Sequence, residues 1–201
     1  MVDICERTSL LPGSCACLGH PAVIGVSPTL PATDNTSLSD YNAGRLHGRW
    51  IDATQGVDAV QAEVVAMLAE SREAVAEEWA IHDYDEFAGV RLGEWEDLAR
   101  VCELAAALVA HGPAFAAWYS GADADSGVAL GEQFEESYVG EFDSLGDYAE
   151  ELATDIGDVT GSQLAMWPFT CIDWERAGRE LEFAGDIWSA DASLGRVWIF
   201  R

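Results

Sequence analysis

The stretch from Gly131 to Val159 constrains this chain most, because it holds ten acids and no Lys or Arg. Those acids are Glu132, Glu135, Glu136, Glu141, Asp143, Asp147, Glu150, Glu151, Asp155 and Asp158. Like charges spaced by one helical turn each destabilise a helix by a few tenths of a kcal/mol. Crowding them without a cation therefore indicates a requirement other than helix stability.

The second half of this stretch predicts a helix with one acidic and one apolar stripe. Residues at i, i+4, i+8 and i+11 share a helix face. In that series stand Asp147, Glu151, Asp155 and Asp158. The same spacing one residue later gives Tyr148, Leu152, Ile156 and Val159. Ser144 and Asp147 resemble the start of a capping box, with Asp in place of the usual Glu.

The charge of the whole chain narrows its partners. It has 201 residues, 36 acids and 10 basic residues, all of them Arg, for a formal charge of −26. Between Arg100 and Arg176 lie 15 acids and no basic residue. Such a field repels nucleic acid and anionic membrane and attracts basic grooves. With 49% hydrophobic residues the chain can bury a core, unlike a disordered acidic tail.

The sequence shows no pattern typical of a membrane protein or of a secreted one. No run of about twenty apolar residues stands out as a membrane span, and Asp3 and Glu6 lie where a signal peptide is basic. Five Cys, an odd number, favour free thiols in a reduced cytoplasmic protein. Cys15, Cys17 and His20 match no standard zinc spacing. We therefore expect no metal and no cofactor.

The pattern predicts an α+β protein of three small modules after a loosely ordered lead. The lead covers residues 1–36 and the first module, a sheet with one helix, residues 37–91. A mainly helical module follows at 92–140, and helices with a terminal hairpin at 141–201.

In the first module, strands are expected at Arg45 to Ala53 and Trp79 to Tyr84, with a helix capped by Asp58 and running to about Ser71. Apolar residues of that helix recur on one face at Val60, Val64, Met67 and Leu68.

In the middle module, a helical stripe is expected to end at Gly112, and Pro113 to open a short helix that reaches Tyr119. The stripe comprises Trp95, Leu98, Cys102, Ala105 and Val109. A loop at Asp123 to Gly127 and a helix from Val128 to Val139 follow.

In the last module, Ile172 to Phe183 is expected to be a helix. Asp186 to Ala192 and Arg196 to Arg201 then predict a hairpin around Ser193-Leu194-Gly195. Its expected inward residues are Trp188, Val197 and Ile199.

Enzyme chemistry has little support. No Gly-rich phosphate loop, HExxH or GxSxG motif is present. His82-Asp83 is the only local acid/base pair, and a structural histidine is the more common role in an alternating strand. A calcium loop counted from Asp123 fails, because Val128 and Phe134 stand where Gly and Glu are required.

Several strings resemble the ArdA antirestriction family in family order. They are SLSDYNAGRLHGRWIDA at 37–53, EEWAIHDYDEF at 77–87, SYVGEFDSLGDYAEE at 137–151, Ile172-Asp173-Trp174 and Gly185-Asp186-Ile187. The resemblance covers about residues 37–201. It departs from the family before Tyr41, where the usual strand is replaced by Pro31 to Thr36, which is poor strand material.

The resemblance implies an elongated, curved mimic of B-form DNA, dimeric through one end, that occupies the DNA groove of type I restriction-modification enzymes. The last module is the expected dimer contact, and no nucleic acid or membrane is bound directly. The expected DNA-mimic surface comprises Asp83, Asp85, Glu86, Glu94, Glu96, Asp97, Glu103, Glu132, Glu135, Glu136, Glu141, Asp143, Asp147, Glu150, Glu151, Asp155 and Asp158.

The residues support this reading independently. Duplex DNA carries one charge per about 1.7 Å of axis, whereas a helix with an acid every turn carries one per roughly 5–6 Å. Several such helices approximate phosphate rows but not base edges. Two other interpretations stay open. The chain could be an acidic DNA mimic that targets another DNA-binding protein, or a salt-adapted structural protein. Arg45 and Arg49 are either internal salt-bridge partners or interface residues.

Overall fold

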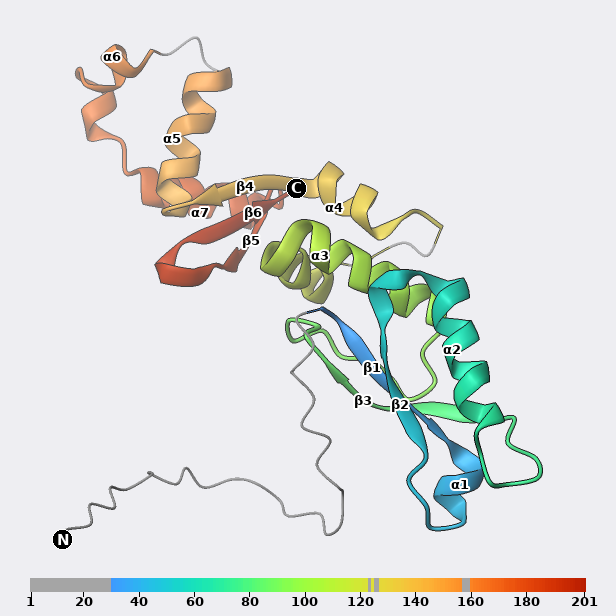
Figure 1. The fold of residues 1–201 in the computed structure, drawn as a ribbon. Helices are drawn as coiled ribbons and strands as arrows, with labels where there is room; N and C mark the ends of the chain where they lie inside the picture. Colours follow the sequence, from blue (N-terminus) through green and yellow to red (C-terminus); the bar gives the residue numbers. More distant parts are fainter. Residues whose placement is uncertain (1–29, 123, 125–126, 157–159) are drawn as a thin grey trace, which may run out of the picture.

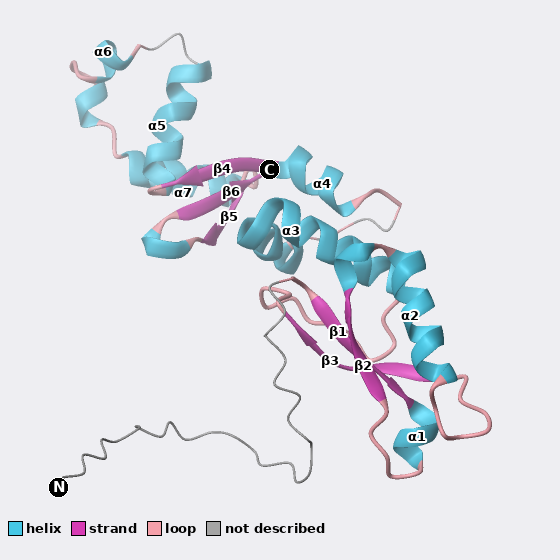
Figure 2. Ribbon diagram, viewed as in Figure 1, coloured by secondary structure: helices cyan, strands magenta, loops and turns pink. Residues whose placement is uncertain are grey.

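The computed structural model describes residues 30–122, 124, 127–156 and 160–201. Within these residues the chain forms seven α-helices and two separate three-stranded sheets, which confirms the α+β class. The molecule is elongated and stepped, with the first sheet at one end and the last helices at the other (Figure 1). Figure 2 shows that each sheet has its own helices.

The first sheet is antiparallel with the order β2-β1-β3. Its strands are β1 (Ala32–Ser37), β2 (Gly48–Asp52) and β3 (Trp79–Asp85). The short helix α1 (Leu38–Asn42) follows β1 directly. Both strands expected in this module are confirmed.

The doubt about a strand before Tyr41 was wrong. β1 is the central strand of the sheet and begins inside the expected lead. Thr33 and Asn35 are fully buried, and the Asn35 amide donates to the Thr33 carbonyl and hydroxyl oxygens. Pairing on both sides satisfies the backbone and outweighs the weak β-propensity of Asp and Asn.

Helix α2 (Val57–Ala69) lies across one face of this sheet. Val60, Val64 and Met67 are buried against Ile51 of β2, as the apolar spacing predicts. The expected cap was wrong, since Gly56 is the N-cap and Asp58 lies in the first turn. Gly56 has φ +92°, a conformation that side chains disfavour.

Helix α3 (Leu98–Gly121) crosses the middle of the molecule. It is broken at Gly112 (φ 64°, ψ −149°), and Pro113 begins its second part, as expected. Trp95 was wrongly placed on it: it lies before the helix and is 69% exposed. Helix α3 is long and apolar enough to cross a membrane, contrary to the expectation from the sequence. Core helices of soluble proteins can have the same length and hydropathy, and 56% of this apolar segment is buried inside the molecule.

Helix α4 (Leu130–Ser137) is shorter than expected, because Tyr138 and Val139 belong to strand β4 (Tyr138–Phe142). That strand pairs with β6 (Val197–Phe200), which pairs in turn with β5 (Trp188–Asp191). The expected boundary at residues 140–141 therefore falls within β4. Of the expected loop at 123–127, Asp123, Asp125 and Ser126 lie outside the described residues.

The terminal hairpin is confirmed, with the turn Ser193–Gly195. Its inward residues, however, divide between two faces. Trp188 stacks on Phe200 at 4.3 Å between ring centroids, on the face toward α3 and α4. Ile199 and Val197 lie in the cluster on the other face, with Tyr148 and Leu181. A sheet covered on both sides has no single inward face.

That second cover consists of α5 (Leu145–Ile156) and α7 (Trp174–Ala184). The Ser144 hydroxyl accepts the Asp147 backbone N–H at 3.1 Å, so the expected start of α5 is confirmed. Asp173 caps α7 through Arg176 N–H. In the sequence, α6 (Gly161–Leu164) and the short 3-10 helix Phe169–Cys171 lie between α5 and α7.

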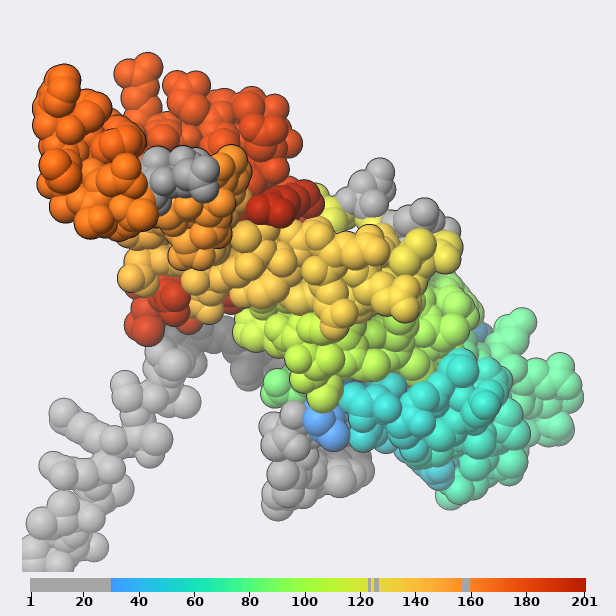
Figure 3. Space-filling view, turned by 90° about the horizontal axis from the view of Figure 1, so that it is seen from above, coloured from blue at the N-terminus to red at the C-terminus, as the bar shows by residue number. Residues whose placement is uncertain are grey.

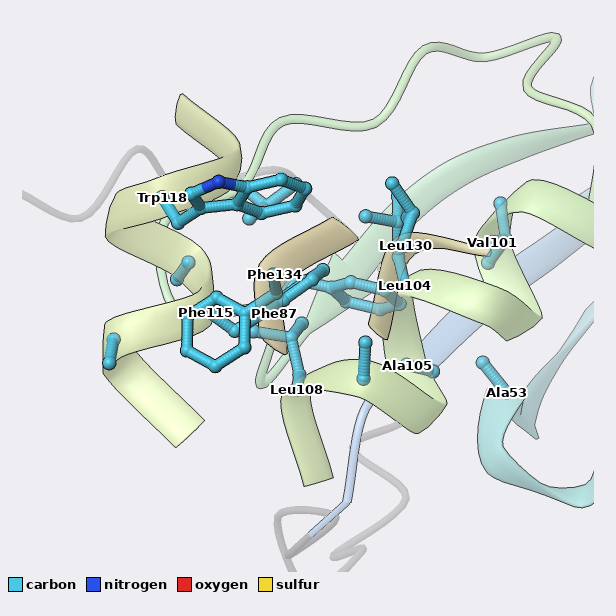
Figure 4. Close-up of a cluster of buried hydrophobic side chains, with 14 of the residues drawn as sticks. Ala53, Phe87, Val101, Leu104, Ala105, Leu108, Phe115, Trp118, Leu130 and Phe134 are labelled. Atoms are coloured by element: carbon cyan, nitrogen blue, oxygen red, sulfur yellow. The ribbon is translucent and has the colours of Figure 1, made fainter. Parts of the chain in front are cut away.

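One hydrophobic cluster links all three modules. It includes Ile81 of β3, Phe115 of α3, Phe134 of α4 and Phe200 of β6. Figure 4 shows Phe115, Trp118 and Phe134 meeting between the helices. Phe115 and Phe134 pack edge to face, 5.7 Å between centroids. Shared burial of this kind couples the relative positions of the modules.

Candidate functional site

The acids of the expected surface are exposed throughout the described residues, apart from three that are half-buried. The half-buried ones are Glu96, Glu103 and Glu150. Asp158, the last acid of the expected stripe, and its apolar neighbour Val159 lie outside the described residues. In the view from above, α4 and β4 (yellow) run along one face between α3 and the third module (Figure 3).

The first group of acids surrounds the end of β3 and the segment before α3. Asp83 and Asp85 each accept the N–H of the next residue, at 2.8 and 2.9 Å. Glu86 then adopts φ +61°, which turns the chain out of the strand. Asp97 is the N-cap residue of α3, where a negative charge favours the helix dipole.

Glu103 belongs to the framework more than to the free surface. Its carboxylate accepts the Leu130 backbone N–H at 2.7 Å and pairs with Arg100 at 3.1 Å. The first of these bonds satisfies a free donor at the start of α4 from a side chain of α3. Glu103 is therefore a structural bridge between two helices.

Helix α4 presents three exposed acids because its apolar residues are held below. Leu130 and Phe134 are buried, while Glu132, Glu135 and Glu136 point to solvent. Glu135 lies 3.8 Å from the ring of His111. Within the described residues, no ion pair involves Glu132 or Glu136.

Arg196, just before β6, lies beside Glu141 of β4 and Asp143, which follows β4. Arg196 pairs with Glu141 at 3.2 Å and with Asp143 at 3.0 Å, so both carboxylates are partly neutralised. Burial raises the pKa of the nearby Tyr138 hydroxyl, and the Glu141 charge raises it further, against a smaller opposing effect of Arg196. The hydroxyl therefore stays protonated near neutral pH.

Helix α5 displays the predicted acid stripe over its described length. Asp147, Glu151 and Asp155 are exposed, and successive members are about 6 Å apart along the axis. On the neighbouring stripe Tyr148 is 3% exposed, whereas Ile156 is 76% exposed. The acidic face is therefore fully displayed, and the apolar face is only partly covered.

The uncovered apolar face of α5 forms a groove with α7. The groove has a volume of about 620 Å³. It is lined by Ala149, Leu152, Ala153, Ile156, Trp174, Ala177, Glu180 and Leu181. Elsewhere in the third module large apolar side chains are also exposed, including Trp167 at 81% and Phe183 at 87%. The third module thus carries an apolar surface in an otherwise highly charged chain.

Arg45 and Arg49 both form salt bridges within the chain. Arg45 bonds Asp40 at 3.2 Å and also pairs with Glu73, and Arg49 binds Glu70 at 2.9 Å. The sequence analysis missed these anchoring acids, although Ser37 followed by Asp40 is a capping signal. Asp40 is 1% exposed. Its hydrogen bond from Ser71 lowers its pKa, burial opposes that change, and Ser37, Arg45 and His47 lower it further.

Among the described residues, no three His, Cys, Asp or Glu side chains lie close enough together to hold a metal ion. Cys15, Cys17 and His20 lie outside those residues. His82 is exposed and contacts Tyr41 edge to face at 4.9 Å between ring centroids. Cys102 is buried, and this burial raises its thiol pKa.

The family model described as antirestriction protein (ArdA) matches residues 36–194, which is most of the chain. A comparison with curated protein sequences gives no match. The chain belongs to the ArdA family of antirestriction proteins.

Proposed function

We propose that this protein mimics the phosphate backbone of DNA, binds the DNA groove of type I restriction-modification enzymes and inhibits them by competition. The carrying observation is the series of exposed acids from the end of β3, across α4, to α5. Glu86, Glu94, Glu132, Glu151 and Asp155 have no basic partner among the described residues. Such carboxylates are available to Arg and Lys of a partner.

The scaffold suits this role because packing sets the spacing of the charges. A groove built for DNA presents its cations at positions matched to a helical backbone. If the modules moved independently, binding to the partner would have to order them, and this would lower the affinity of the complex. The cluster shared by Phe115, Phe134 and Phe200 restrains such movement.

Binding is directed at sequence-independent contacts. A carboxylate resembles a phosphate oxygen in charge and hydrogen-bond acceptance but does not reproduce base edges. The inhibitor therefore competes for the cations that hold the DNA backbone, in restriction and in modification alike. It acts by binding alone and needs no cofactor.

We also propose that two copies associate through the groove of α5 and α7. An apolar groove lined by Leu152, Ile156 and Trp174 is unusual on a chain of charge −26. The proposed occupant is a second copy of this chain. In a two-fold symmetric dimer the same surface patch of both copies meets, so each groove is buried by the other copy. The proposed place of action is the cytoplasm, during entry of a mobile genetic element.

A competition titration tests the proposed function. A fluorescent duplex bound to a type I methyltransferase core is challenged with this protein at two salt concentrations. Displacement is expected, and it should weaken at the higher salt because counterions are taken up again when the complex dissociates. A lack of displacement from several such enzymes would overturn the proposed target. Displacement of equal strength at both salts would overturn charge mimicry.

A further inference from the structure

A second groove lies beside the start of β3, away from the acid rows of α4 and α5. Its volume is about 360 Å³. Its walls are residues 77–79 and 94–96, which contribute Glu77, Glu78, Trp79, Glu94, Trp95 and Glu96. A concave site lined by two indoles and four carboxylates differs chemically from the purely acidic faces elsewhere.

Backbone hydrogen bonds hold both walls. The Ile81 N–H of β3 donates to the Glu94 carbonyl at 3.0 Å, which ties the second wall to the sheet. The Leu38 N–H donates to the Glu78 carbonyl at 3.0 Å, which fixes the first wall. The second wall is itself part of a tight turn, in which the Glu96 N–H donates to the Gly93 carbonyl at 3.3 Å. Apart from Trp79 of β3, both walls are thus loop residues that backbone hydrogen bonds anchor to β3 and to the start of α1.

The two indoles have different environments. Trp79 is half-buried and packs against two core clusters, so its position is explained by the fold. Trp95 is 69% exposed on the turn, and it belongs to no core cluster of the described residues. Hydrophobic burial does not account for a large aromatic side chain held in water at the rim of a groove.

The chain supplies no cation to this groove. Across the described residues, no ion pair involves Glu77, Glu78, Glu94 or Glu96. Glu73, only four residues before Glu77, does pair with Arg45. The Glu96 carboxylate accepts the Gly93 backbone N–H at 3.3 Å. None of the four carboxylates is neutralised by a cation among the described residues, so each can still pair with one from outside.

We propose that this groove is a binding subsite for the guanidinium group of an arginine side chain of the protein partner. A planar guanidinium stacks on an indole and donates two parallel hydrogen bonds to a carboxylate, and it is more weakly hydrated than an ammonium group. Trp95 supplies the stacking face, with the four carboxylates around it. Nucleic acid bases also stack on indoles, but their phosphates are repelled here.

The subsite rests on the proposed function and deepens it. A surface of distributed acids attracts any basic groove, whereas a site shaped for one guanidinium fixes the register of the complex. Arginine and tryptophan are also the residues that most often dominate interface energetics. The subsite is therefore expected to contribute more than any single acid of α5.

The first test compares Trp95 variants in displacement of DNA from the methyltransferase core. W95L keeps apolar area but loses the aromatic face, and W95F keeps an aromatic face. W95L is expected to raise the concentration needed for half displacement about three- to thirtyfold, and W95F much less. W50L, which alters another exposed tryptophan of the first module, is the matched control. Equal losses for W95L and W50L, or none for W95L, would overturn the subsite.

The second test needs no restriction enzyme. Arginine amide and lysine amide are titrated separately at constant ionic strength, while the indole N–H signal of Trp95 is followed by NMR. Arginine amide is expected to shift this signal progressively, lysine amide to shift it less, and E94Q/E96Q to reduce the shift. Equal responses to both amides, or a response unchanged in E94Q/E96Q, would overturn the assignment.

The two tests separate the subsite from the proposed function. Binding of arginine amide without displacement of DNA from any type I enzyme would leave the subsite and overturn the target. Displacement by the wild type that W95L retains in full, with no arginine-specific shift, would overturn the subsite and leave the function. Urea unfolding of each variant verifies that the fold is kept.

Discussion

The carboxylate of Glu103 on α3 accepts the backbone N–H of Leu130 at 2.7 Å, so one helix caps the next. Its other oxygen pairs with Arg100. Within a surface of exposed acids, this one holds the middle module together. Exposed acids and structural acids therefore have different expected phenotypes.

Replacing Glu103 by Ala should destabilise the fold by about 1–2 kcal/mol, as for loss of a helix N-cap. The reason is the unsatisfied N–H of Leu130. Urea unfolding measures the change. E136A, on the exposed face of α4, serves as the control and should stay within about 0.5 kcal/mol. Equal effects of both substitutions would contradict a structural role for Glu103.

Neutralising the α5 acids together should weaken inhibition without unfolding the protein. The variant D147N/E151Q/D155N removes three exposed charges from one face. Exposed charges act additively and weakly, so each single change should have a small effect and the triple change a clearly larger one. E151Q should even gain a few tenths of a kcal/mol, because it relieves repulsion along the helix. DNA displacement and urea unfolding are measured on each variant. Complete loss from one substitution in a folded protein would indicate a discrete site instead.

The buried carboxylate of Asp40 should make stability dependent on acid pH. Its folded pKa lies below the ordinary value of 3.8, first because of the Ser71 hydrogen bond. A group with a lowered folded pKa stabilises the protein fully above its unfolded pKa, and this contribution is lost as pH falls through the folded value. The stability difference between wild type and D40N should therefore be largest above about pH 5 and shrink below pH 3.8. Urea unfolding as a function of pH checks this, and a constant difference would contradict it.

Gly178 should be intolerant of any side chain. A Cβ there would lie 2.4 Å from the backbone oxygen of Leu145, where α7 crosses the start of α5. Backbone atoms cannot rotate away, so G178A should destabilise the third module by about 1–3 kcal/mol. G161A is the matched control, since open space surrounds that position. Thermal unfolding compares the two variants, and similar melting temperatures would disprove the close crossing.

Ile156→Asn should weaken the proposed dimer while leaving each copy folded, because this side chain is 76% exposed on the groove. V65N alters a comparably exposed apolar residue of α2 and should not change association. Sedimentation velocity at two salt concentrations measures the oligomer. Salt should strengthen self-association, since it screens two chains of charge −26. Unchanged association of I156N would exclude the groove as the contact.

Elements with a strong local signal were predictable from the sequence. The apolar spacing of Val60, Val64 and Met67 marked α2, and the Gly112-Pro113 pair marked the break in α3. Local propensity failed for β1, whose Asp and Asn residues disfavour a strand. Two neighbouring strands stabilise it: β2, the next strand along the chain, and β3, whose residues lie more than 40 positions away.

The candidate surface was predictable in the same limited sense. The acids of α5 follow from spacing alone, because a helix period places them on one face whatever surrounds the helix. The structural role of Glu103 was not predictable, since Leu130 is 27 residues away. The groove of Trp79 and Trp95 likewise depends on a hydrogen bond between β3 and the segment before α3.

By itself, therefore, the sequence determined the charge, the amphipathic periods and the resemblance to a family, because these are properties of neighbours along the chain. Only the tertiary structure decided which acids are free and which are held. It also decided that Trp188 and Ile199 face opposite sides of one sheet, and that Trp95 stands at the rim of a groove. The physical reason is that burial and ion pairing depend on contacts between distant segments, and those form only when the chain is folded.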